Sequence, residues 1–470
     1  MRGLGRLAAA AAVGLLCIAS SFGVGATIVV GVEADLISPD PALSQRHPVT
    51  QMIYSLLYAP LFRLEPESGR QAVFQSVQPE GPALWQLVID PNSGLSAAEV
   101  AAALRRAYTE SGLAGYTAPS RDRLPWIVDV WVADHTSVYL QLSRSVPSLP
   151  LHLAQEYLAL PGAGGEPVGT GPYRLAQWSP GNSITLIKKE PGGEPHDRLV
   201  FDVIPSLSQR VQAFVAGAID VLPYVPLAYV DGLLAVEGTE IQARPGTRSR
   251  FIELNTTKPP FDDARVRKAL NLAIDVPAML HDVYGGFGYP LATIVPPTTV
   301  GYDTSLEPYP FDLQAARELL VEAGYPEGFD FELDVLAERY EEALYFARMW
   351  EAVGVRASLR VWPDWDSLKD AVLEGNRLAW TAEWNNTSRD PSSVLGAKVR
   401  TGGSANYGGY SHAEVDRLLR SAQGCQSVLT CAPLFAQVQR TLWSDAAMVF
   451  GYVEAELLAT RAPVGWELWP

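Results

Sequence analysis

Cysteine is scarce in this chain of 470 residues, which contains only three. Cys17 lies near the N-terminus, whereas Cys425 and Cys431 lie close together near the other end. In an oxidising compartment this isolated pair is predicted to form a disulfide, and two buried free thiols are the alternative. Because neither residue of the pair has a histidine nearby, the pair does not indicate a metal site.

Clustered histidines and nucleophile motifs are also missing. The six histidines are scattered, none has another three or four residues away, and H-E-x-x-H does not occur. A metal site assembled from distant residues is the alternative that such scattering leaves open. The strings nearest to the serine-hydrolase motif G-x-S-x-G, GYSHA at 409–413 and GLSAA at 94–98, both lack its second glycine. The sequence therefore predicts no enzyme, no metal and no other cofactor.

Basic residues are outnumbered, with 36 Lys and Arg against 52 Asp and Glu and a formal net charge of −16. A chain this acidic is a poor candidate for binding nucleic acid or an anionic membrane surface, because both repel it. Hydrophobic residues make up 48% of the chain and charged residues 19%, which is typical of a globular protein. At about 150 residues per domain, the length allows two or more domains.

Residues 1–26 differ in composition from the rest of the chain. Two arginines precede an uncharged apolar run, Leu7–Phe22, and small residues end the segment at Ala26. The run is shorter than the roughly 20 residues of a membrane span, so it predicts a secretory signal peptide and an exported, periplasmic or cell-envelope protein. Lipid attachment through Cys17 is the less favoured alternative, because Leu16 stands where a small residue is preferred.

The segment GTGPYRLAQW at 169–178 has the glycine content of a phosphate-binding loop. Gly169 and Gly171 could shape such a loop, but Pro172 lacks the backbone N–H that it would need. No Lys-Ser or Lys-Thr pair follows, and the residues from Tyr173 onward alternate in polarity like a strand. We therefore expect a glycine-shaped turn that contacts no nucleotide.

A β-hairpin is predicted after this turn. Tyr173, Leu175 and Gln177 fall on one face of its first strand, and Trp178 falls on the other. The turn residues S-P-G-N follow, and SITLIKK at 183–189 supplies the second strand.

Helix-like and strand-like segments alternate along the remaining chain. Helical composition or periodicity marks residues 97–112, 208–222, 263–284, 312–329 and 341–354, and strand-like runs mark 126–143, 331–336 and 355–362. Asp312 is a suitable N-cap for the fourth of these helices, which Gly324 ends. This alternation predicts α/β layers with mostly parallel sheets.

Four stretches in order along the chain carry a resemblance to a known family. They are VGTGPYRLAQWSPGNSITLIKK at 168–189, FIELNTTKPPFDDARVRKALNLAID at 251–275, AARELLVEAGYPEGFDFEL at 315–333 and NYGGYSHAEVDRLL at 406–419. In these stretches the chain resembles the family 5 extracellular solute-binding proteins of ABC importers, the dipeptide- and oligopeptide-binding class. The resemblance covers nearly the whole chain after residue 26, and Gly169–Tyr173 is part of its structural signature.

The resemblance implies a two-lobed α/β fold of the type II periplasmic-binding-protein class, with an extra subdomain in the first lobe and a hinge of crossing strands. The implied division is lobe I at 27–250 with the extra subdomain at about 61–168, lobe II at 251–448, and a return to lobe I at 449–470. The chain would cross near Arg248–Asn255 and return near Met448–Val453. Because residues 73–100 form a shorter segment than usual in the family, a reduced extra subdomain is expected.

The resemblance also implies a function. Such a protein captures a peptide-like or other polar, oligomeric solute between two lobes that close on it, and delivers it to the transmembrane permease of an ABC importer. We expect a monomer that binds no nucleic acid. A sensory binding protein that reports to a membrane receptor is an alternative, and a secreted hydrolase is disfavoured by the missing motifs.

One departure from the family falls in the segment Trp384–Thr387. Peptide-binding members place an aspartate three residues after the matching tryptophan, where it pairs with the amino terminus of the peptide, and here that position is Thr387. A hydroxyl cannot replace a charge-assisted hydrogen bond, so a ligand with a free α-amine in the usual pose is not expected. Trp384, Asn385, Asn386 and Thr387 offer a ring face and neutral polar groups, which suit sugars, amides or modified peptides.

Other carboxylates are alternative partners for a cationic group. A shift of the alignment by a few residues would let Asp390 or Glu383 meet the amine, although Asp390 precedes a proline and otherwise has a structural character. Glu33, at the end of the first strand, is a second candidate, with a solvated turn carboxylate as the alternative.

Overall fold

The computed structural model describes residues 27–43, 47–64, 72–109, 119–162, 166–190, 196–462 and 464. Residues 1–26 lie outside these ranges, so the signal peptide and the lipid attachment through Cys17 stay predictions. Within the described ranges, no helix has both the length and the apolar character needed to cross a bilayer.

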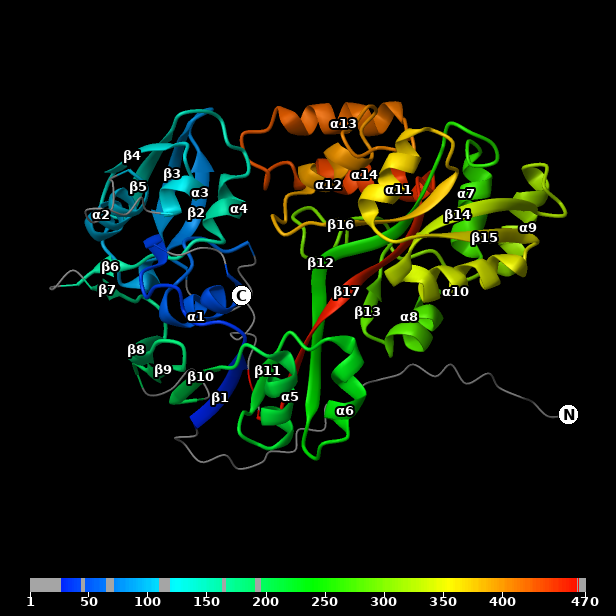
Figure 1. Ribbon diagram of the computed structural model, residues 1–470. Coiled ribbons are helices and arrows are strands. Elements are labelled where there is room, and N and C mark those ends of the chain that lie inside the picture. Colours follow the sequence, from blue (N-terminus) through cyan, green and yellow to red (C-terminus); the bar gives the residue numbers. More distant parts are fainter. Residues whose placement is uncertain are drawn as a thin grey trace, which may run out of the picture.

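One large sheet extends through both halves of the molecule (Figure 1). In the described part of the chain it has eleven strands, ordered β15-β14-β16-β12-β17-β11-β1-β10-β9-β8, with β13 paired to β17. The strands are β1 (Thr27–Val32), β8 (Tyr173–Ser179), β9 (Ser183–Lys188), β10 (Arg198–Val203), β11 (Val221–Pro223), β12 (Glu240–Leu254), β13 (Gly288–Pro290), β14 (Phe329–Leu336), β15 (Val355–Trp362), β16 (Ala379–Asn385) and β17 (Val449–Thr460).

Antiparallel pairs outnumber parallel pairs in this sheet. Strand β1 runs parallel to β10 and β11, and β14 runs parallel to β15 and β16. The six other pairings between its described strands are antiparallel. The prediction of mostly parallel sheets was therefore wrong. A hairpin such as β8–β9 reverses the direction of the chain, so its two strands are antiparallel. Strand β17, which returns from the second half of the molecule, likewise runs opposite to β12, which leads into it.

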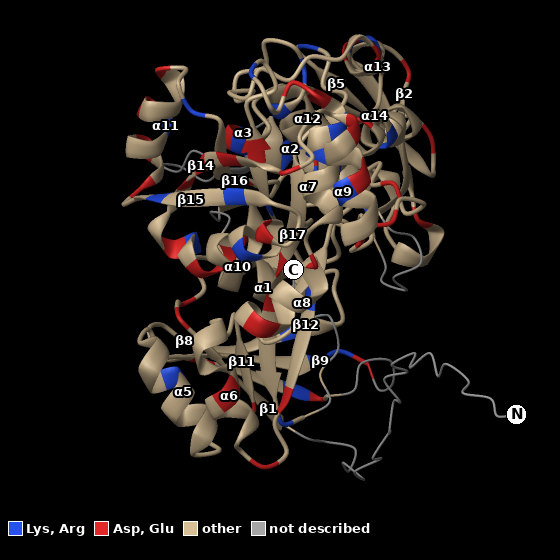
Figure 2. Ribbon diagram, turned by 90° about the vertical axis from the view of Figure 1, so that its right-hand side faces the viewer, with Lys and Arg blue, Asp and Glu red and all other residues tan. Residues whose placement is uncertain are grey.

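Strands β12 and β17 join the two lobes (Figure 1 and Figure 2). They pair antiparallel from Glu240 opposite Thr460 to Ile252 opposite Val449. The first lobe contains β1 and β8–β11, and β11 pairs with β17; the second lobe contains β14–β16, and β16 pairs with β12. The two long strands therefore form a hinge of crossing strands, while the residue boundaries of the lobes stay a prediction.

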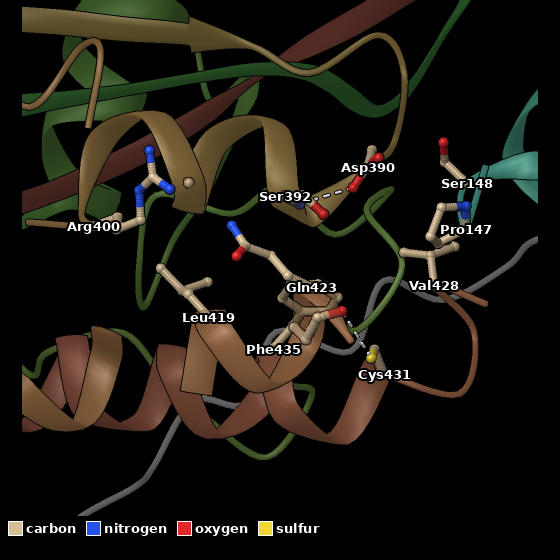
Figure 3. A pocket seen from close by; sticks show the side chains of 12 residues that line it. Pro147, Ser148, Asp390, Ser392, Arg400, Leu419, Gln423, Val428, Cys431 and Phe435 are labelled. Carbon is tan, nitrogen blue, oxygen red and sulfur yellow. Dashed lines mark hydrogen bonds between the residues drawn. The ribbon is translucent and has the colours of Figure 1, made fainter. Parts of the chain in front are cut away.

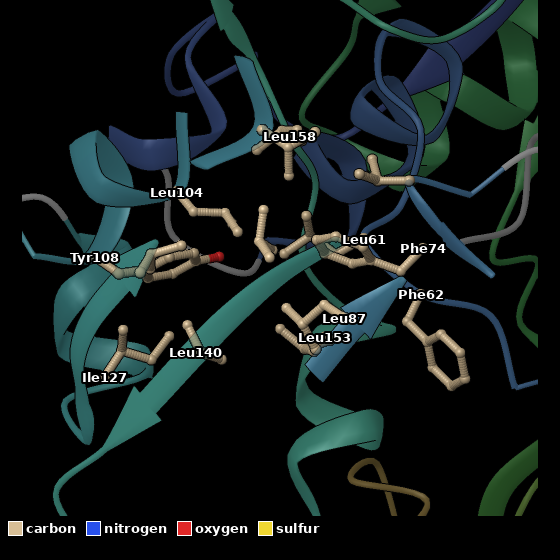
Figure 4. Close-up of a cluster of buried hydrophobic side chains, with 14 of the residues drawn as sticks. Leu61, Phe62, Phe74, Leu87, Leu104, Tyr108, Ile127, Leu140, Leu153 and Leu158 are labelled. Atoms are coloured by element: carbon tan, nitrogen blue, oxygen red, sulfur yellow. The ribbon is translucent and has the colours of Figure 1, made fainter. Parts of the chain in front are cut away.

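A separate antiparallel sheet builds the extra subdomain of the first lobe. Its order is β2 (Phe74–Pro79), β3 (Leu84–Ile89), β5 (Ser137–Leu142) and β4 (Ile127–Val132). Helix α2 (Ala97–Tyr108) packs against β4 and β5. Leu87, Leu104 and Leu140 belong to the apolar core of this subdomain (Figure 4). The pairing of β4 with β5 confirms the two strands predicted within 126–143.

Helices cover the sheets, and most of them belong to the second lobe. Outside α2, they are α1 (Pro48–Leu57), α3 (Pro119–Arg123), α4 (Leu149–Leu153), α5 (Leu207–Val215), α6 (Val230–Leu234), α7 (Ala264–Leu272), α8 (Val276–Tyr284), α9 (Leu313–Glu322), α10 (Tyr340–Glu351), α11 (Trp365–Leu373), α12 (Pro391–Lys398), α13 (Ala413–Gln423) and α14 (Ala432–Ser444). Helix α9 begins after Asp312, whose carboxylate accepts from two backbone N–H groups, as predicted. The predicted disulfide between Cys425 and Cys431 is confirmed and links α13 to α14.

Two of the predicted helices are corrected. The segment 208–222 contributes only α5, because Gly217 then adopts a left-handed φ of 76° and the chain continues into β11. The segment 263–284 contains two helices, α7 and α8, rather than one. The break occurs because the Asp275 carboxylate accepts from the Ala278 N–H at 2.9 Å and starts a new helix.

The G-T-G turn packs against the end of helix α1. A Cβ atom on Gly169 would lie 2.2 Å from the carbonyl oxygen of Leu57, and one on Gly171 would lie 2.5 Å from that of Leu56. The Gly171 N–H donates to the Leu57 carbonyl at 2.9 Å. Glycine is therefore required by close backbone contact, and the turn fixes the β8–β9 hairpin to α1.

The predicted β8–β9 hairpin is confirmed, but one face of its first strand is corrected. The register shifts between Leu175 and Gln177, which marks a β-bulge. The extra residue changes the alternation, so Gln177 is exposed, while Trp178 packs with Tyr173 against the apolar core. The Trp178 indole N–H donates to Asp35 at 2.9 Å.

Candidate functional site

Two residues of the first lobe lie where neighbouring parallel strands end. Strands β1 and β11 are adjacent, and Glu33 and Tyr224 follow them directly. Ligands of open α/β sheets bind beyond the carboxyl ends of such strands. Tyr224 has a φ of 55°, which a non-glycine residue rarely adopts, and strained residues of this kind gather at functional sites. This edge of the sheet is the first part of the candidate site.

The surroundings of Tyr224 connect this edge to the hinge. Burial raises the pKa of its hydroxyl to about 12, Glu456 and Glu33 add to the rise, and Arg244 opposes it. The Val225 N–H also donates to the Leu457 carbonyl at 3.0 Å, so Tyr224 lies beside the segment of β17 that carries Glu456. Glu33 also lies 4.0 Å from Arg210 of α5, so the carboxylate at this edge has a cation beside it.

A row of paired charges crosses the hinge strands. It consists of Arg244, Arg248 and Arg250 of β12, Glu454 and Glu456 of β17, and Glu383 of β16, which together are called the charge ladder. Arg244 lies 2.7 Å from Glu456, and Arg248 lies 2.5 Å from Glu383. Arg250 pairs with Glu454 and lies 3.6 Å from Glu383. The ladder therefore extends from the first-lobe edge of the sheet to a strand of the second lobe.

The ladder is balanced and partly shielded from water. Three cations face three anions, and the exposed fraction ranges from 13% for Arg250 to 39% for Arg248. Burial alone would lower the pKa of Arg250, but Glu454 and its other anionic neighbours hold it above its ordinary value. Opposite charges on neighbouring strands stabilise a sheet by up to about 1 kcal/mol per pair. The charges therefore hold one another in a fixed pattern.

Two β-bulges interrupt the hinge strands beside the ladder. The β12–β17 register shifts between Pro245 and Ser249, and again between Arg250 and Phe251. At the second shift a Cβ atom on Gly451 would lie 2.4 Å from the Arg250 carbonyl oxygen, so only glycine fits. Bulges bend a strand and redirect its side chains, and they are frequent next to binding sites.

The segment Trp384–Thr387, which the resemblance predicts to bind the ligand, follows Glu383 at the second-lobe end of the ladder. Trp384 and Asn385 pair with β12 next to Glu383. Trp384 is half-buried, and its buried indole N–H has no hydrogen-bond partner among the described residues. Asn385 is exposed and accepts a hydrogen bond from Thr247 at 2.8 Å, and Thr387 is exposed as well. The indole N–H is a donor that a bound solute could satisfy.

Asn386 and Asp390 are engaged within the protein. The buried side-chain amide of Asn386 donates to Thr299 at 3.1 Å, and its carbonyl oxygen accepts from Ser388 at 3.0 Å. Asp390 caps α12 by accepting from the Ser392 N–H at 2.8 Å. These bonds give both residues structural roles, and direct contact with a ligand stays a prediction for each.

Sequence reasoning missed most of the ladder and the strained Tyr224. The sequence indicates Glu383 only as an alternative amine partner, and it does not single out the arginines of β12 or the glutamates of β17. The signal was present as Arg-x-Arg at 248–250 and Glu-x-Glu at 454–456, which put like charges on one face of each strand.

Metal-ligating side chains of the described residues form no separate centre. In the ranges that the structure describes, no three His, Cys, Asp or Glu side chains are placed to hold a metal ion. The candidate site offers ion pairs, a tyrosine hydroxyl, an indole ring and amide groups. This chemistry suits the binding of a polar solute.

Known proteins share this sequence pattern. The family model for bacterial extracellular solute-binding proteins, family 5, matches residues 92–406, which is more than half of the chain. Heme-binding protein A of Haemophilus influenzae is 28% identical over 295 residues, 60% of this chain and 54% of that protein. The dipeptide-binding protein of Escherichia coli is 26% identical over 293 residues, 60% of this chain and 55% of that protein. The match therefore spans about half the length of these curated relatives.

Solved structures share the fold. The periplasmic murein tripeptide-binding protein MppA, in its unliganded open form, matches with a TM-score of 0.75 at 20% identity, over 94% of this chain and 95% of that chain. At this identity the likeness establishes the two-lobed α/β fold. Because the family model covers most of the chain and the fold agrees, the chain belongs to the bacterial extracellular solute-binding proteins of family 5.

Proposed function

We propose that this protein is an exported receptor that captures a peptide-like or other polar solute between its lobes and delivers it to the permease of an ABC importer. The observation that carries the proposal is the charge ladder, which crosses both hinge strands. Glu33 and Tyr224 of the first lobe follow β1 and β11 beside one end, and Glu383 of β16 in the second lobe forms the other. Relatives in the family are named for binding dipeptides, glutathione and heme, which supports a solute-binding role.

Closure of the lobes follows from this placement. A solute that touches both ends of the ladder makes its full set of contacts only when the lobes are close together. It therefore binds the closed form better and shifts the population toward it. Two crossing strands with irregular register are a suitable hinge for such a movement, because they let the lobes rotate without breaking either core.

The balanced ladder also limits the class of solute. Each ladder charge already has an opposite partner, so a solute with a large net charge would leave one of them buried and unpaired. A neutral or internally balanced solute can instead exchange partners with the ladder. Trp384 lies on the opposite face of β16 from Glu383, so its unpartnered N–H is a separate polar contact, which an amide, a sugar or a modified peptide can satisfy.

Screening of peptides, amides and oligosaccharides by thermal shift tests this proposal. We expect a polar solute to raise the unfolding temperature, to be recovered chemically unchanged, and to decrease the radius of gyration in solution scattering. The decrease follows because bound solute favours closed lobes. Stabilisation without a change in the radius of gyration would contradict capture between the lobes, and turnover of the solute would contradict a receptor without catalytic activity.

Replacement of Arg248 by alanine is expected to weaken binding of that solute at least about tenfold, because it leaves Glu383 without its nearest partner. Isothermal titration calorimetry of the variant and the wild type measures the change. Arg356→Ala, on the outer strand β15, is the matched control, since it breaks an exposed ion pair with Asp330 of β14 and should leave Kd unchanged. Equal affinity of the Arg248 variant and the wild type would exclude the ladder from the binding site.

A further inference from the structure

The disulfide-closed loop from Cys425 to Cys431 touches the opposite lobe. It joins α13 to α14 in the second lobe. At its centre the Val428 N–H donates to the carbonyl oxygen of Pro147 at 2.8 Å. Pro147 lies just before α4, in the extra subdomain of the first lobe, and Val428 is only 4% exposed. The hydrogen bond between the lobes is therefore shielded from water.

Apolar side chains extend this contact. Leu151 of α4 is buried in a cluster with Cys431 and Phe435 of the second lobe. Leu149 and Leu153 of the same short helix are buried in the core of the extra subdomain. Helix α4 therefore contributes to one core in each lobe, and it lies at the seam, which is the contact surface between the lobes. A movement of the loop should therefore change the packing of α4.

Packing along this seam is incomplete. A pocket of about 260 Å³, partly open to solvent, lies between Pro147 and Ser148 on the first-lobe side and residues of α12, α13 and α14 on the other (Figure 3). Arg400 and Phe435 are among its second-lobe lining residues. Atoms that line this pocket contact fewer protein atoms than atoms in a closed core, so separating these two surfaces costs less than opening a close-packed core.

We infer that this loop is a latch that holds the extra subdomain to the second lobe, and that its disulfide keeps the latch in shape. The disulfide restricts the conformations of the loop, so the loop loses less conformational entropy when the Val428 N–H donates to the Pro147 carbonyl. Reduction therefore loosens the contact between the lobes and leaves the charge ladder untouched. In the receptor proposed above it also weakens solute binding, and only this last consequence depends on the proposed function.

Reduction requires an added dithiol reagent. A thiolate of the reagent attacks the sulfur of Cys425, which is half-buried, and Cys431, which is fully buried, leaves as a thiolate. The S–S bond of the protein breaks, and a second thiol of the reagent completes its own disulfide. Two electrons and two protons pass to the protein, which is left with two thiols.

Hydrogen exchange of the solute-free protein, followed by mass spectrometry before and after treatment with dithiothreitol, tests the latch. Exchange is expected to rise at least about fivefold in the 425–431 loop and also in α4, which lies far away in sequence. A rise confined to the loop, or no rise, would overturn the latch. The double variant Cys425→Ser, Cys431→Ser should show the same faster exchange without reagent and no further change with it.

Solute affinity supplies the second readout. For a solute identified by the thermal-shift screen, reduction is expected to raise Kd about three- to tenfold, because a smaller fraction of the solute-free protein then has its lobes held together by the latch. An unchanged Kd would overturn the coupling between latch and binding. If no solute binds at all, the proposed function fails, while the exchange of α4 still decides whether the latch exists.

Discussion

Replacement of Gly171 by alanine is expected to destabilise the protein by at least about 3 kcal/mol. The added Cβ atom would lie 2.5 Å from the Leu56 carbonyl oxygen and 2.7 Å from the backbone nitrogen of Tyr58. All of these atoms belong to the main chain at the end of α1, so no side-chain rotation can relieve the clash. Either the hairpin must move away from α1 or the last turn of the helix must distort.

Urea denaturation followed by circular dichroism measures this loss through the midpoint of unfolding. Gly81→Ala is the matched control, because a Cβ atom there meets nothing within 4 Å, and its effect should stay within about 0.5 kcal/mol. Equal midpoints for the Gly171 variant and the wild type would mean that the turn does not lie against α1 in solution.

Replacement of Lys398 by methionine should cost about 3–5 kcal/mol of unfolding free energy. The Lys398 ammonium lies 2.7 Å from the Glu253 carboxylate, and both side chains are almost fully buried. The second oxygen of Glu253 accepts from the Gly408 N–H at 2.9 Å. Without the lysine, a buried carboxylate on hinge strand β12 would keep one hydrogen bond and no counter-charge.

The double variant Lys398→Met, Glu253→Gln separates loss of charge pairing from loss of packing. Glutamine keeps an acceptor for Gly408 and removes the unpaired charge, so the double variant should recover most of the stability that the single variant loses. Urea denaturation of the two single variants and the double variant gives the coupling free energy. Purely additive losses would contradict an interaction between these two side chains.

Much of the local structure could be predicted from the sequence. The turn at Gly169–Tyr173, the hairpin after it and the cap at Asp312 depend on residues close together in the chain, and all three are present. The bulge between Leu175 and Gln177 could not be predicted, because a bulge is one extra residue relative to the partner strand. The sequence of one strand does not show how it is aligned with its partner. The glycines were assigned to a turn, but their contact with α1 depends on residues more than a hundred positions earlier.

The candidate site could be predicted only in part, for the same reason. The resemblance pointed to Trp384–Thr387, which lies beside the ladder, because a family motif is carried by one continuous segment. The ladder pairs are made by residues that are distant in the chain: 135 positions separate Arg248 from Glu383, and 212 separate Arg244 from Glu456. Such pairs become visible only once strand neighbours are known. Tyr224 gave no signal, since its strain belongs to the backbone.

The return strand β17 also affects when the protein can fold. It is the last strand of the described chain, and β11 and β12, made about two hundred residues earlier, both pair with it. While the chain is being synthesised, the sheet of the first lobe therefore lacks one of its central strands until the second-lobe segments that precede β17 have been made. Pairing across such long sequence separations is slow to form, so the first lobe should be completed only after the second-lobe strands, although most of its own strands precede them.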